Sequence, residues 1–336
     1  MRLELDRIRA AVAAIDPVFL DTPQYECAAL GDALGCSIVL KVETLNPVRS
    51  FKGRGTETVM ASLAQRPNGM AAVCASAGNL GQALAYSGSR RGIPVTVVAA
   101  RGANALKVER MRALGATVRL EGEDIEDARE LAVRIAEEEG AYLVEDSLEL
   151  ATCEGAGTIG LELLEAPEQV DTLLIALGGG ALASGVSYVA KSLAPEVETI
   201  GIQPEGAPAM ALSWRGGRVV VTETMDTIAD GVAGRCPIPE VLDDLLEVLD
   251  DVALVSEDSI KAGMGLLYRH AGLVVEPSAA LGVATVLEDP ERFAGRRVAT
   301  IVCGSNVATA DFERWALHDS VTDVGRQGRL DDLGGL

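Results

Sequence analysis

From about residue 37 onward, short runs rich in β-branched residues alternate with stretches of helical periodicity. SIVLKVE (37–43) predicts a strand and is followed by a predicted helix at 55–66. MAAVCAS (70–76) predicts a buried strand and is followed by a predicted helix at 77–92. Parallel strands need a long crossover connection, which is usually a helix. The alternation therefore predicts an α/β fold with open, mostly parallel sheets that carry helices on both faces.

The same alternation continues to the end of the chain and indicates two lobes. Further strands are predicted at 93–100, 116–122, 170–180, 198–204 and 296–306, with helices at 103–115 and 124–140. A chain of 336 residues exceeds what one hydrophobic core usually holds. We assign residues 1–65 and 150–320 to a large lobe and residues 66–149 to a small lobe. The polar, glycine-rich residues 321–336 are expected to form a loosely held tail.

Charge and cysteine usage exclude several classes of partner. The formal net charge of −21 argues against nucleic acid and against an anionic membrane, because both require a cationic face. The six cysteines form no CxxC pair and no histidine has ligand spacing to them, so we expect free thiols, a reducing compartment and no metal site. The N-terminus is charged and no long apolar run occurs. A cytoplasmic protein is predicted.

A glycine cluster follows the predicted strand at 170–177. GGGALASG (178–185) leaves successive backbone N–H groups free to surround an anion, and the following helix adds the positive end of its dipole. The cluster is not a P-loop, because Val186 and Ser187 follow Gly185 where lysine and a hydroxyl residue would be needed. The sequence predicts a phosphate-binding cup here, with a tight turn as the alternative.

A second glycine pattern, GAGTIG (155–160), matches the dinucleotide fingerprint G-x-G-x-x-G. That fingerprint requires a strand before it, whereas SLELATCE is not a convincing strand and the pattern continues as helix into LELLEA. We therefore expect these glycines to serve close helix packing. A nicotinamide-dependent oxidoreductase would rest on this pattern alone.

Two further segments follow predicted strands. In SAGN (76–79), Ser76 and the helix N-terminal amides could hold a carboxylate, and the Asn79 amide could donate to a ring oxygen. In CGSN (303–306), Cys303 could face a bound ring. Each segment also has a simpler interpretation, since serine and asparagine often cap helices and cysteine is often a small buried residue.

Lys52 lies in NPVRSFKGRG (46–55), after Phe51 and before two glycines, Gly53 and Gly55. A lysine amine can form an imine with a carbonyl compound. Taken alone, Lys52 would be read as a solvated lysine near the start of a helix. A lysine, a phosphate cup and ring contacts at strand ends together indicate pyridoxal 5'-phosphate.

In these motifs the chain resembles the fold-type II pyridoxal-phosphate enzymes, the tryptophan synthase β-like superfamily, and most closely its serine/threonine dehydratase branch. The resemblance covers about residues 20–310 and implies a cofactor in the cleft between a large cofactor-binding lobe and a small substrate-loop lobe. It implies that Lys52 is the Schiff-base lysine and catalytic base, and that the segments TIADGVAG (227–234) and VVEPSAA (274–280) face the cofactor. The implied cofactor contacts are Lys52, Phe51, Asn79, Gly178, Gly179, Gly180, Ala181, Leu182, Glu276 and Cys303, and the implied substrate loop is Ser76, Ala77, Gly78 and Asn79, with Ser76 as a second catalytic residue.

Departures from the family pattern bear on the reaction. Cys303 stands where the ring nitrogen would be met, as in serine dehydratases, and a thiol leaves the ring a moderate electron sink, which suits β-elimination. Ala77 replaces the second serine of the related racemases, and Gln203 and Ala209 replace their acidic metal ligands. Poor racemisation and no metal are therefore expected.

The resemblance implies deamination of a β-hydroxy L-amino acid such as threonine or serine to a 2-oxo acid and ammonia. The alternatives are β-replacement, as in the cysteine synthase branch, and elimination on a specialised β-substituted amino acid. A scaffold that binds a partner without catalysis is a further alternative. A small-molecule amino acid is the expected partner, and a homodimer is implied by the resemblance alone.

Overall fold

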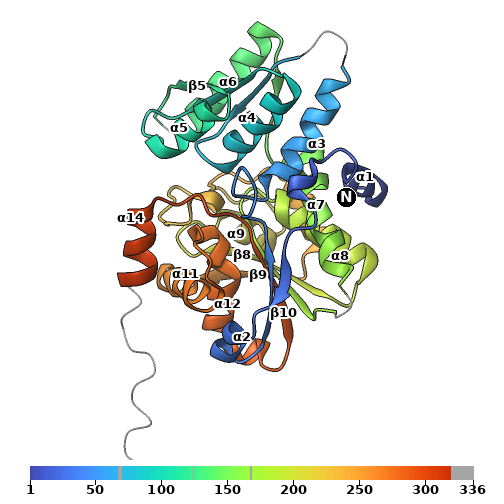
Figure 1. Ribbon diagram of the computed structural model, residues 1–336, viewed down its shortest axis with the longest axis vertical. Helices are drawn as coiled ribbons and strands as arrows, with labels where there is room; N and C mark the ends of the chain where they lie inside the picture. Colours follow the sequence, from blue (N-terminus) through green and yellow to red (C-terminus); the bar gives the residue numbers. More distant parts are fainter. Residues whose placement is uncertain (67–69, 124, 167–168, 319–336) are drawn as a thin grey trace, which may run out of the picture.

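Two open sheets contain the strands of this protein (Figure 1). A computed structural model describes residues 1–66, 70–123, 125–166 and 169–318. The expected tail, 321–336, lies outside these residues. The mixed α/β architecture with mostly parallel sheets confirms the predicted fold class.

The smaller sheet forms the upper lobe in Figure 1 and is parallel throughout. Its two central strands bury side chains on both faces, since successive side chains of a strand point to opposite faces of the sheet. Val73 and Val98 pack against α6 (Ile125–Glu139) on one face, and Cys74 and Val97 join the core on the other. In spatial order its strands are β5 (Thr117–Leu120), β4 (Val95–Ala99), β3 (Ala72–Ala75) and β6 (Tyr142–Leu143).

The larger sheet forms the core of the lower lobe. All of its strand pairs are parallel except the pair of β1 with β2 at one edge. Its central strands are continuous runs of buried apolar residues, as expected for a sheet covered on both faces. In spatial order its strands are β1 (Gln24–Glu26), β2 (Ser37–Val42), β10 (Arg297–Val302), β7 (Thr172–Ala176), β8 (Glu198–Pro204) and β9 (Asp251–Val255).

The helices cover the faces of both sheets and the junction between the lobes (Figure 1). The predicted helix at 55–66 in fact begins at Lys52, so the lysine lies in the first turn of α3. The helices besides α6 are α1 (Leu5–Ala11), α2 (Ala28–Leu34), α3 (Lys52–Ala64), α4 (Asn79–Arg91), α5 (Ala105–Ala113), α7 (Leu150–Leu164), α8 (Ala181–Leu193), α9 (Ala209–Gly216), α10 (Pro239–Val248), α11 (Glu257–Ala271), α12 (Leu281–Glu288), α13 (Pro290–Phe293) and α14 (Thr309–Phe312). Short turns of other helix types are η1 (Pro17–Phe19), η2 (Asp230–Val232), η3 (Pro277–Ala280) and η4 (Glu313–His318).

The GAGTIG pattern lies inside α7, and no strand precedes it directly. A Cβ on Gly155 would come within 2.6 Å of the Arg54 carbonyl oxygen on α3, and one on Gly157 within 3.2 Å of the Gly185 carbonyl oxygen on α8. These glycines allow three helix backbones to approach closely. The packing interpretation is confirmed.

A buried ionic network joins β2, α3 and α7 below the junction. Arg54 is fully buried and binds Glu43, at 2.8 and 2.9 Å, and Glu162, at 2.6 and 2.9 Å. Lys41 donates to Glu162 at 2.5 Å and to the Thr22 carbonyl at 2.9 Å. Burial opposes the charge of Glu162, but hydrogen bonds from Arg54 and Lys41 lower the pKa of its carboxyl to about 2. Two cations and two carboxylates therefore balance one another in the interior.

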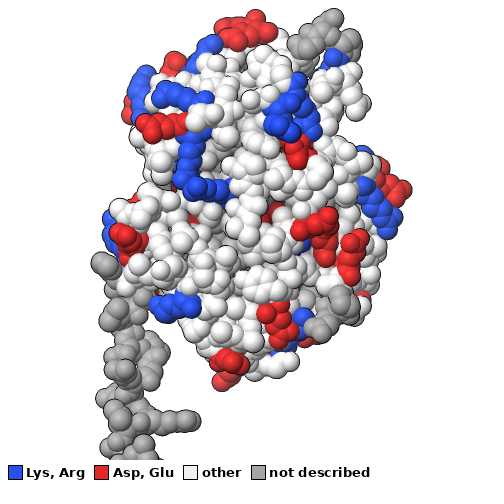
Figure 2. Space-filling view, viewed as in Figure 1, with Lys and Arg blue, Asp and Glu red and all other residues white. Residues whose placement is uncertain are grey.

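On the face drawn in Figure 2, basic side chains of the upper lobe extend down to the boundary with the lower lobe. Two contacts from α5 cross this boundary: Lys107 pairs with Asp230, and Arg110 donates to Asn306 at 2.8 Å. None of the helices in the described part of the chain combines the length and apolarity that crossing a bilayer requires.

Arg54→Met tests the buried network. The substitution keeps the volume but leaves Glu43 buried without its cation, so we expect the free energy of unfolding to fall by about 3–5 kcal/mol. Urea unfolding followed by circular dichroism measures the change. Arg119→Met, which removes an exposed ion pair with Glu139, is the control and should cost less than about 1 kcal/mol. Equal losses in the two variants would contradict the assigned role.

Candidate active site

A pocket lies where the carboxyl ends of β2, β7 and β10 meet the small lobe. It combines residues from segments far apart in the sequence, as expected at strand ends of open α/β sheets. Its lining residues are Phe51, Lys52, Asn79, Asp146, Ser147, Ala176, Gly178, Gly179, Gly180, Ala181, Leu182, Gly231, Val232, Glu276, Ser278 and Cys303. All ten residues expected to contact the cofactor are therefore in one place.

Lys52 enters the pocket from the first turn of α3. Its Nζ donates to both carboxylate oxygens of Asp146, at 2.6 and 2.5 Å, and lies 4.8 Å from the centre of the Phe51 ring. The flanking glycines do not surround the amine. Gly53 packs against the Phe19 ring, and Gly55 packs against Thr152. The polar partner of the Lys52 amine is Asp146.

The glycine cluster forms a cup between β7 and α8. Gly180 has φ of 111°, a left-handed conformation that favours glycine. A Cβ on Gly179 would lie 2.5 Å from Ser147 Oγ, and one on Gly178 would lie 3.0 Å from Val232. The Ala181 N–H, the first of α8, donates to Ser147 Oγ at 3.2 Å. The cup is therefore a concave surface of backbone donors with one buried hydroxyl.

Asn79 and Glu276 line the same pocket and belong to a hydrogen-bonded chain. Asn79 Nδ2 donates to Glu276 Oε1 at 2.8 Å, and Asn306 donates to Asn79 Oδ1 at 2.7 Å and, through its backbone, to Glu276 Oε2 at 3.0 Å. Arg110 donates to Asn306 from the small lobe. Burial, and then the charge of Asp230, raises the pKa of the Glu276 carboxyl. The chain fixes the Asn79 amide in a single orientation.

Cys303 lines the pocket at the end of β10. Burial, and then the nearby Glu276, raises the pKa of the thiol, so it stays neutral at physiological pH. Its carbonyl accepts the Phe51 N–H at 3.0 Å, which ties the lysine segment to β10. A neutral thiol at this position agrees with the expectation of a weakly polarised ring.

Of the expected substrate loop, Asn79 alone lines the pocket. Ser76 Oγ accepts the N–H groups of Gly78 and Gly81, both at 3.1 Å, and so also caps the start of α4. The N–H groups in the first turn of α4 have no acceptor within the helix, and the space beside Gly78 is open. The loop can therefore present backbone amides to a carboxylate, as the sequence predicts. The Ser76 hydroxyl also has a structural role, because it accepts two backbone N–H groups of this loop and of α4.

Gln203 and Ala209, which stand where related racemases have metal ligands, are buried. Gln203 Oε1 accepts the Ala211 N–H at 2.8 Å and thereby satisfies the first turn of α9. The Gln203 side-chain oxygen is therefore used by the fold.

The pocket fits pyridoxal phosphate by three tests. A Cβ on Gly178, Gly179 or Gly180 would come within 3.0 Å of a neighbouring residue, so the cup keeps its shape only with glycine at these positions. The hydroxyl of Ser278, which is buried and lines the pocket, has no hydrogen-bond partner among the described residues. Lys52 is the one lysine that lines the pocket in the described part of the chain.

The family model described as "Pyridoxal-phosphate dependent enzyme" matches residues 15–304.

The chain belongs to this pyridoxal-phosphate dependent enzyme family. It is 36% identical over 305 residues to an L-threonine ammonia-lyase of Thermotoga maritima, covering 91% of this chain and 76% of that protein. It is 33% identical over 295 residues to an L-threo-3-hydroxyaspartate ammonia-lyase of Saccharomyces cerevisiae, covering 88% and 90%. The solved structure of maize serine racemase superposes with a TM-score of 0.88 at 30% identity, covering 94% of this chain and 97% of that one. Pyridoxal phosphate is therefore the cofactor.

Several lining residues of this family member were not individually predicted. Gly231, Val232 and Ser278 lie in the two segments that the resemblance placed at the cofactor face, so part of the signal was available. Asp146 and Ser147 lie in VEDSLEL, between β6 and α7, and carry no motif. Only the fold brings that connection to the pocket.

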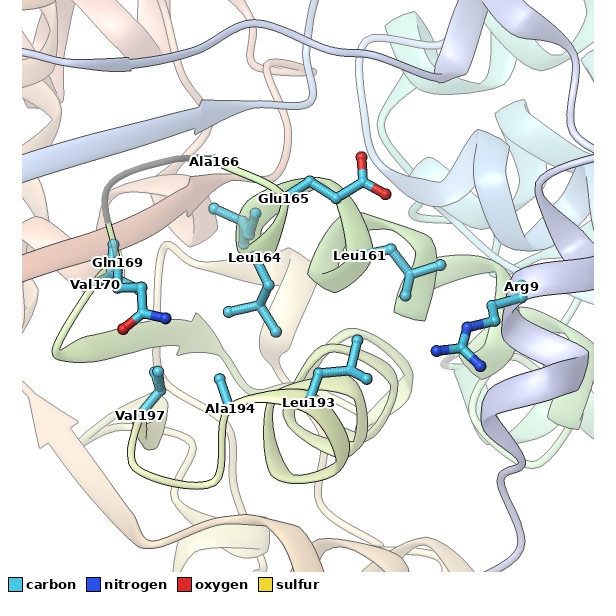
Figure 3. Close-up of a pocket in the computed structure, with 11 residues that line it drawn as sticks. Arg9, Leu161, Leu164, Glu165, Ala166, Gln169, Val170, Leu193, Ala194 and Val197 are labelled. Atoms are coloured by element: carbon cyan, nitrogen blue, oxygen red, sulfur yellow. The ribbon is translucent and has the colours of Figure 1, made fainter.

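A larger hollow, of about 250 Å³, lies at the C-terminal ends of α7 and α8 (Figure 3). Leu161, Leu164 and Leu193 form much of its wall, and Arg9 reaches toward it from α1. It contains no lysine, cysteine or histidine among its lining residues. The residues that could hold the cofactor line the smaller pocket at the strand ends instead.

Ser147→Ala tests the cup. Because the hydroxyl sits against the Ala181 N–H, we expect it to donate to the cofactor phosphate, and its loss should weaken pyridoxal-phosphate binding about tenfold. Titration of the cofactor-free protein, followed by visible absorbance, gives the dissociation constant. Ser192→Ala, at the exposed end of α8, is the control and should bind as the wild type does. Unchanged affinity in Ser147→Ala would remove this residue from the cup.

Proposed function

We propose that this protein catalyses β-elimination from a β-hydroxy L-amino acid such as threonine or serine, and releases a 2-oxo acid and ammonia. The observation that carries the proposal is that Lys52, the glycine cup and the hydrogen-bonded pair of Asn79 and Glu276 all line one pocket. The similarity to an L-threonine ammonia-lyase and to an L-threo-3-hydroxyaspartate ammonia-lyase supports elimination as the outcome.

Binding of cofactor and substrate follows from the charges and donors around the pocket. The cup amides and the N-terminus of α8 would hold the phosphate. The Asn79 amide, held by Glu276 and Asn306, would donate to the ring oxygen. The first-turn amides of α4 would receive the substrate carboxylate. These contacts place the amino group and Cα of the substrate near Lys52, and such positioning lowers the entropic part of the barrier.

When bound, pyridoxal phosphate supplies an aldehyde that condenses with amino groups and a ring that accepts electron density from Cα. Lys52, once released as a free amine, is the base within reach that can remove the Cα proton. The β-hydroxyl leaves only if it gains a proton, and the Lys52 ammonium so formed is a donor for it. Cys303 is a neutral thiol and would not protonate the cofactor ring strongly. A weakly protonated ring would stabilise negative charge at Cα only briefly, which favours rapid loss of the leaving group.

Two other outcomes use the same site. β-Replacement would require a second nucleophile to enter before the unsaturated product leaves. Racemisation would require an acid on the opposite face of the substrate, where the racemases have a serine and this chain has Ala77. The similarity to maize serine racemase makes D-amino acid formation the alternative to measure, and Ala77 favours its being minor.

We also infer a cytoplasmic homodimer. All six cysteines are free thiols in the structure, which suits a reducing compartment. The dimer follows from the resemblance to the serine/threonine dehydratases.

The test is an assay of three products with the cofactor-loaded protein. L-threonine, L-serine and L-threo-3-hydroxyaspartate are supplied in turn, and ammonia, 2-oxo acid and D-amino acid are quantified. We expect ammonia and 2-oxo acid in equal amounts from at least one substrate, with D-amino acid a small fraction. Lys52→Ala should abolish turnover, a loss of at least about 1000-fold.

Lys191→Ala is the control variant, because Lys191 pairs with Asp250 at the surface and should leave turnover unchanged. Sulfide added to the assay tests replacement. A new sulfur-containing amino acid formed faster than ammonia would contradict elimination as the main reaction.

A further inference from the structure

The Asp146 carboxylate contacts the amine of Lys52. Both of its oxygens accept hydrogen bonds from Nζ, at 2.6 and 2.5 Å. The side chains are 16% exposed for Lys52 and 34% exposed for Asp146, so the pair is partly shielded from water and its attraction is stronger than that of a surface pair. Both residues line the pocket that holds the glycine cup. The pair therefore belongs to the catalytic pocket.

Asp146 is held in place by its own segment. Its carbonyl oxygen accepts a hydrogen bond from Thr152 Oγ1, and the next residue, Ser147, is tied to α8 through the Ala181 N–H. The segment is therefore anchored to α7 on one side and to the cup on the other. The carboxylate faces Lys52 from a fixed backbone.

The charges around the pair leave Asp146 as the partner of the lysine nitrogen. Among the described residues, no other carboxylate lies within ion-pair distance of Lys52 Nζ. The thiols of Cys153 and Cys303 are also near Lys52, but burial raises the pKa of both, so they are neutral. Burial, and then the charge of Asp146, also raises the pKa of the Cys74 thiol, so this thiol is neutral as well.

Glu276 lines the same pocket, but its oxygens are engaged by Asn79 and Asn306. It therefore does not compete with Asp146 for the lysine nitrogen. The ring of Phe51, 4.8 Å from Nζ, adds a further weak attraction for a cation.

We propose that Asp146 is a positioning residue for the Lys52 nitrogen, and that it stabilises positive charge on that nitrogen both when the amine is free and when it is bonded to the cofactor. A carboxylate within hydrogen-bond distance attracts positive charge on that nitrogen, and the partial burial of the pair strengthens the attraction. This first part of the proposal rests on the Asp146–Lys52 contact and on pyridoxal phosphate as the cofactor. The second part is that Asp146 thereby speeds turnover, and it rests on the proposed elimination.

The first test is spectroscopic and needs no substrate. The visible band of the cofactor-loaded protein is lost as pH rises, because the linking nitrogen loses its proton. Asp146→Asn removes the charge and keeps the shape, so the pH midpoint of band loss should fall by about one unit or more. Asp146→Glu, which restores the charge, should bring the midpoint back toward the wild-type value. A midpoint in Asp146→Asn equal to the wild-type value would overturn the proposal.

Glu145→Gln is the matched control. Glu145 is the preceding residue and pairs with Arg129, so the same change of charge one position away should leave the midpoint unchanged. An equal shift in Glu145→Gln would show a general effect of net charge and would overturn the specific role. If Asp146→Asn fails to retain cofactor, Asp146→Glu carries the test. Asp146→Glu must then bind cofactor and lose its visible band at a pH midpoint near the wild-type value. If neither Asp146→Asn nor Asp146→Glu shows the visible band, the result counts against the proposal.

The second test is steady-state kinetics on whichever substrate yields ammonia. Asp146→Asn should lower kcat at least tenfold with a smaller change in KM, because the charge acts on the lysine nitrogen more than on the bound substrate. A kcat within twofold of the wild-type value would overturn the second part. If no substrate yields ammonia with the wild-type protein, the proposed elimination fails, and the band titration still decides the role of Asp146.

Discussion

The buried charge of Arg54 is the constraint on which the catalytic end of the molecule depends. Arg54 lies two residues after Lys52 in α3 and binds Glu43, at the end of β2, and Glu162, on α7. A guanidinium without solvent must keep its carboxylate partners, so β2, α3 and α7 cannot move independently. The first turn of α3, and with it the lysine, is therefore fixed relative to the large sheet. The position of the Lys52 amine is therefore set by residues that do not line the pocket.

Close helix packing completes this support. Gly155 on α7 brings the α3 backbone against α7, and Gly157 does the same for α8, whose N-terminus closes the phosphate cup. The two ends of the site, the lysine and the cup, are thereby mounted on neighbouring helices. The opposite wall, Asn79 with Glu276 and Asn306, joins the small lobe to the strand ends of the large one. The cleft between the lobes is thus built from rigid elements, with Asn79, Arg110 and Lys107 reaching across it.

The sequence was most informative where local chemistry decides structure. The alternation of strands and helices predicted both sheets, and the missing strand before GAGTIG correctly predicted that these glycines serve helix packing. The cup and Lys52 could be recognised because a glycine cluster after a strand and a lysine followed by glycines are visible in a linear pattern. Asp146 and Ser147 could not, because their role depends on a connection between β6 and α7 that returns to the pocket only in three dimensions. The same holds for Arg110, whose contact with Asn306 joins positions almost 200 residues apart. The Ser76 hydroxyl shows the limit in another way, since its contacts with Gly78 and Gly81 are those of a helix cap, which the sequence had offered as the simpler interpretation.

The most direct measurement is chemical labelling of the lysine that bonds the cofactor. The chain has five lysines, and besides Lys52 they are Lys41, Lys107, Lys191 and Lys261. Three of these are paired with Glu162, Asp230 and Asp250 away from the pocket lining. The cofactor-loaded protein is reduced with borohydride, digested and mapped by mass spectrometry. The account predicts the pyridoxyl phosphate mass on the peptide that contains Lys52. Label on any other lysine, with Lys52 unmodified, would contradict it.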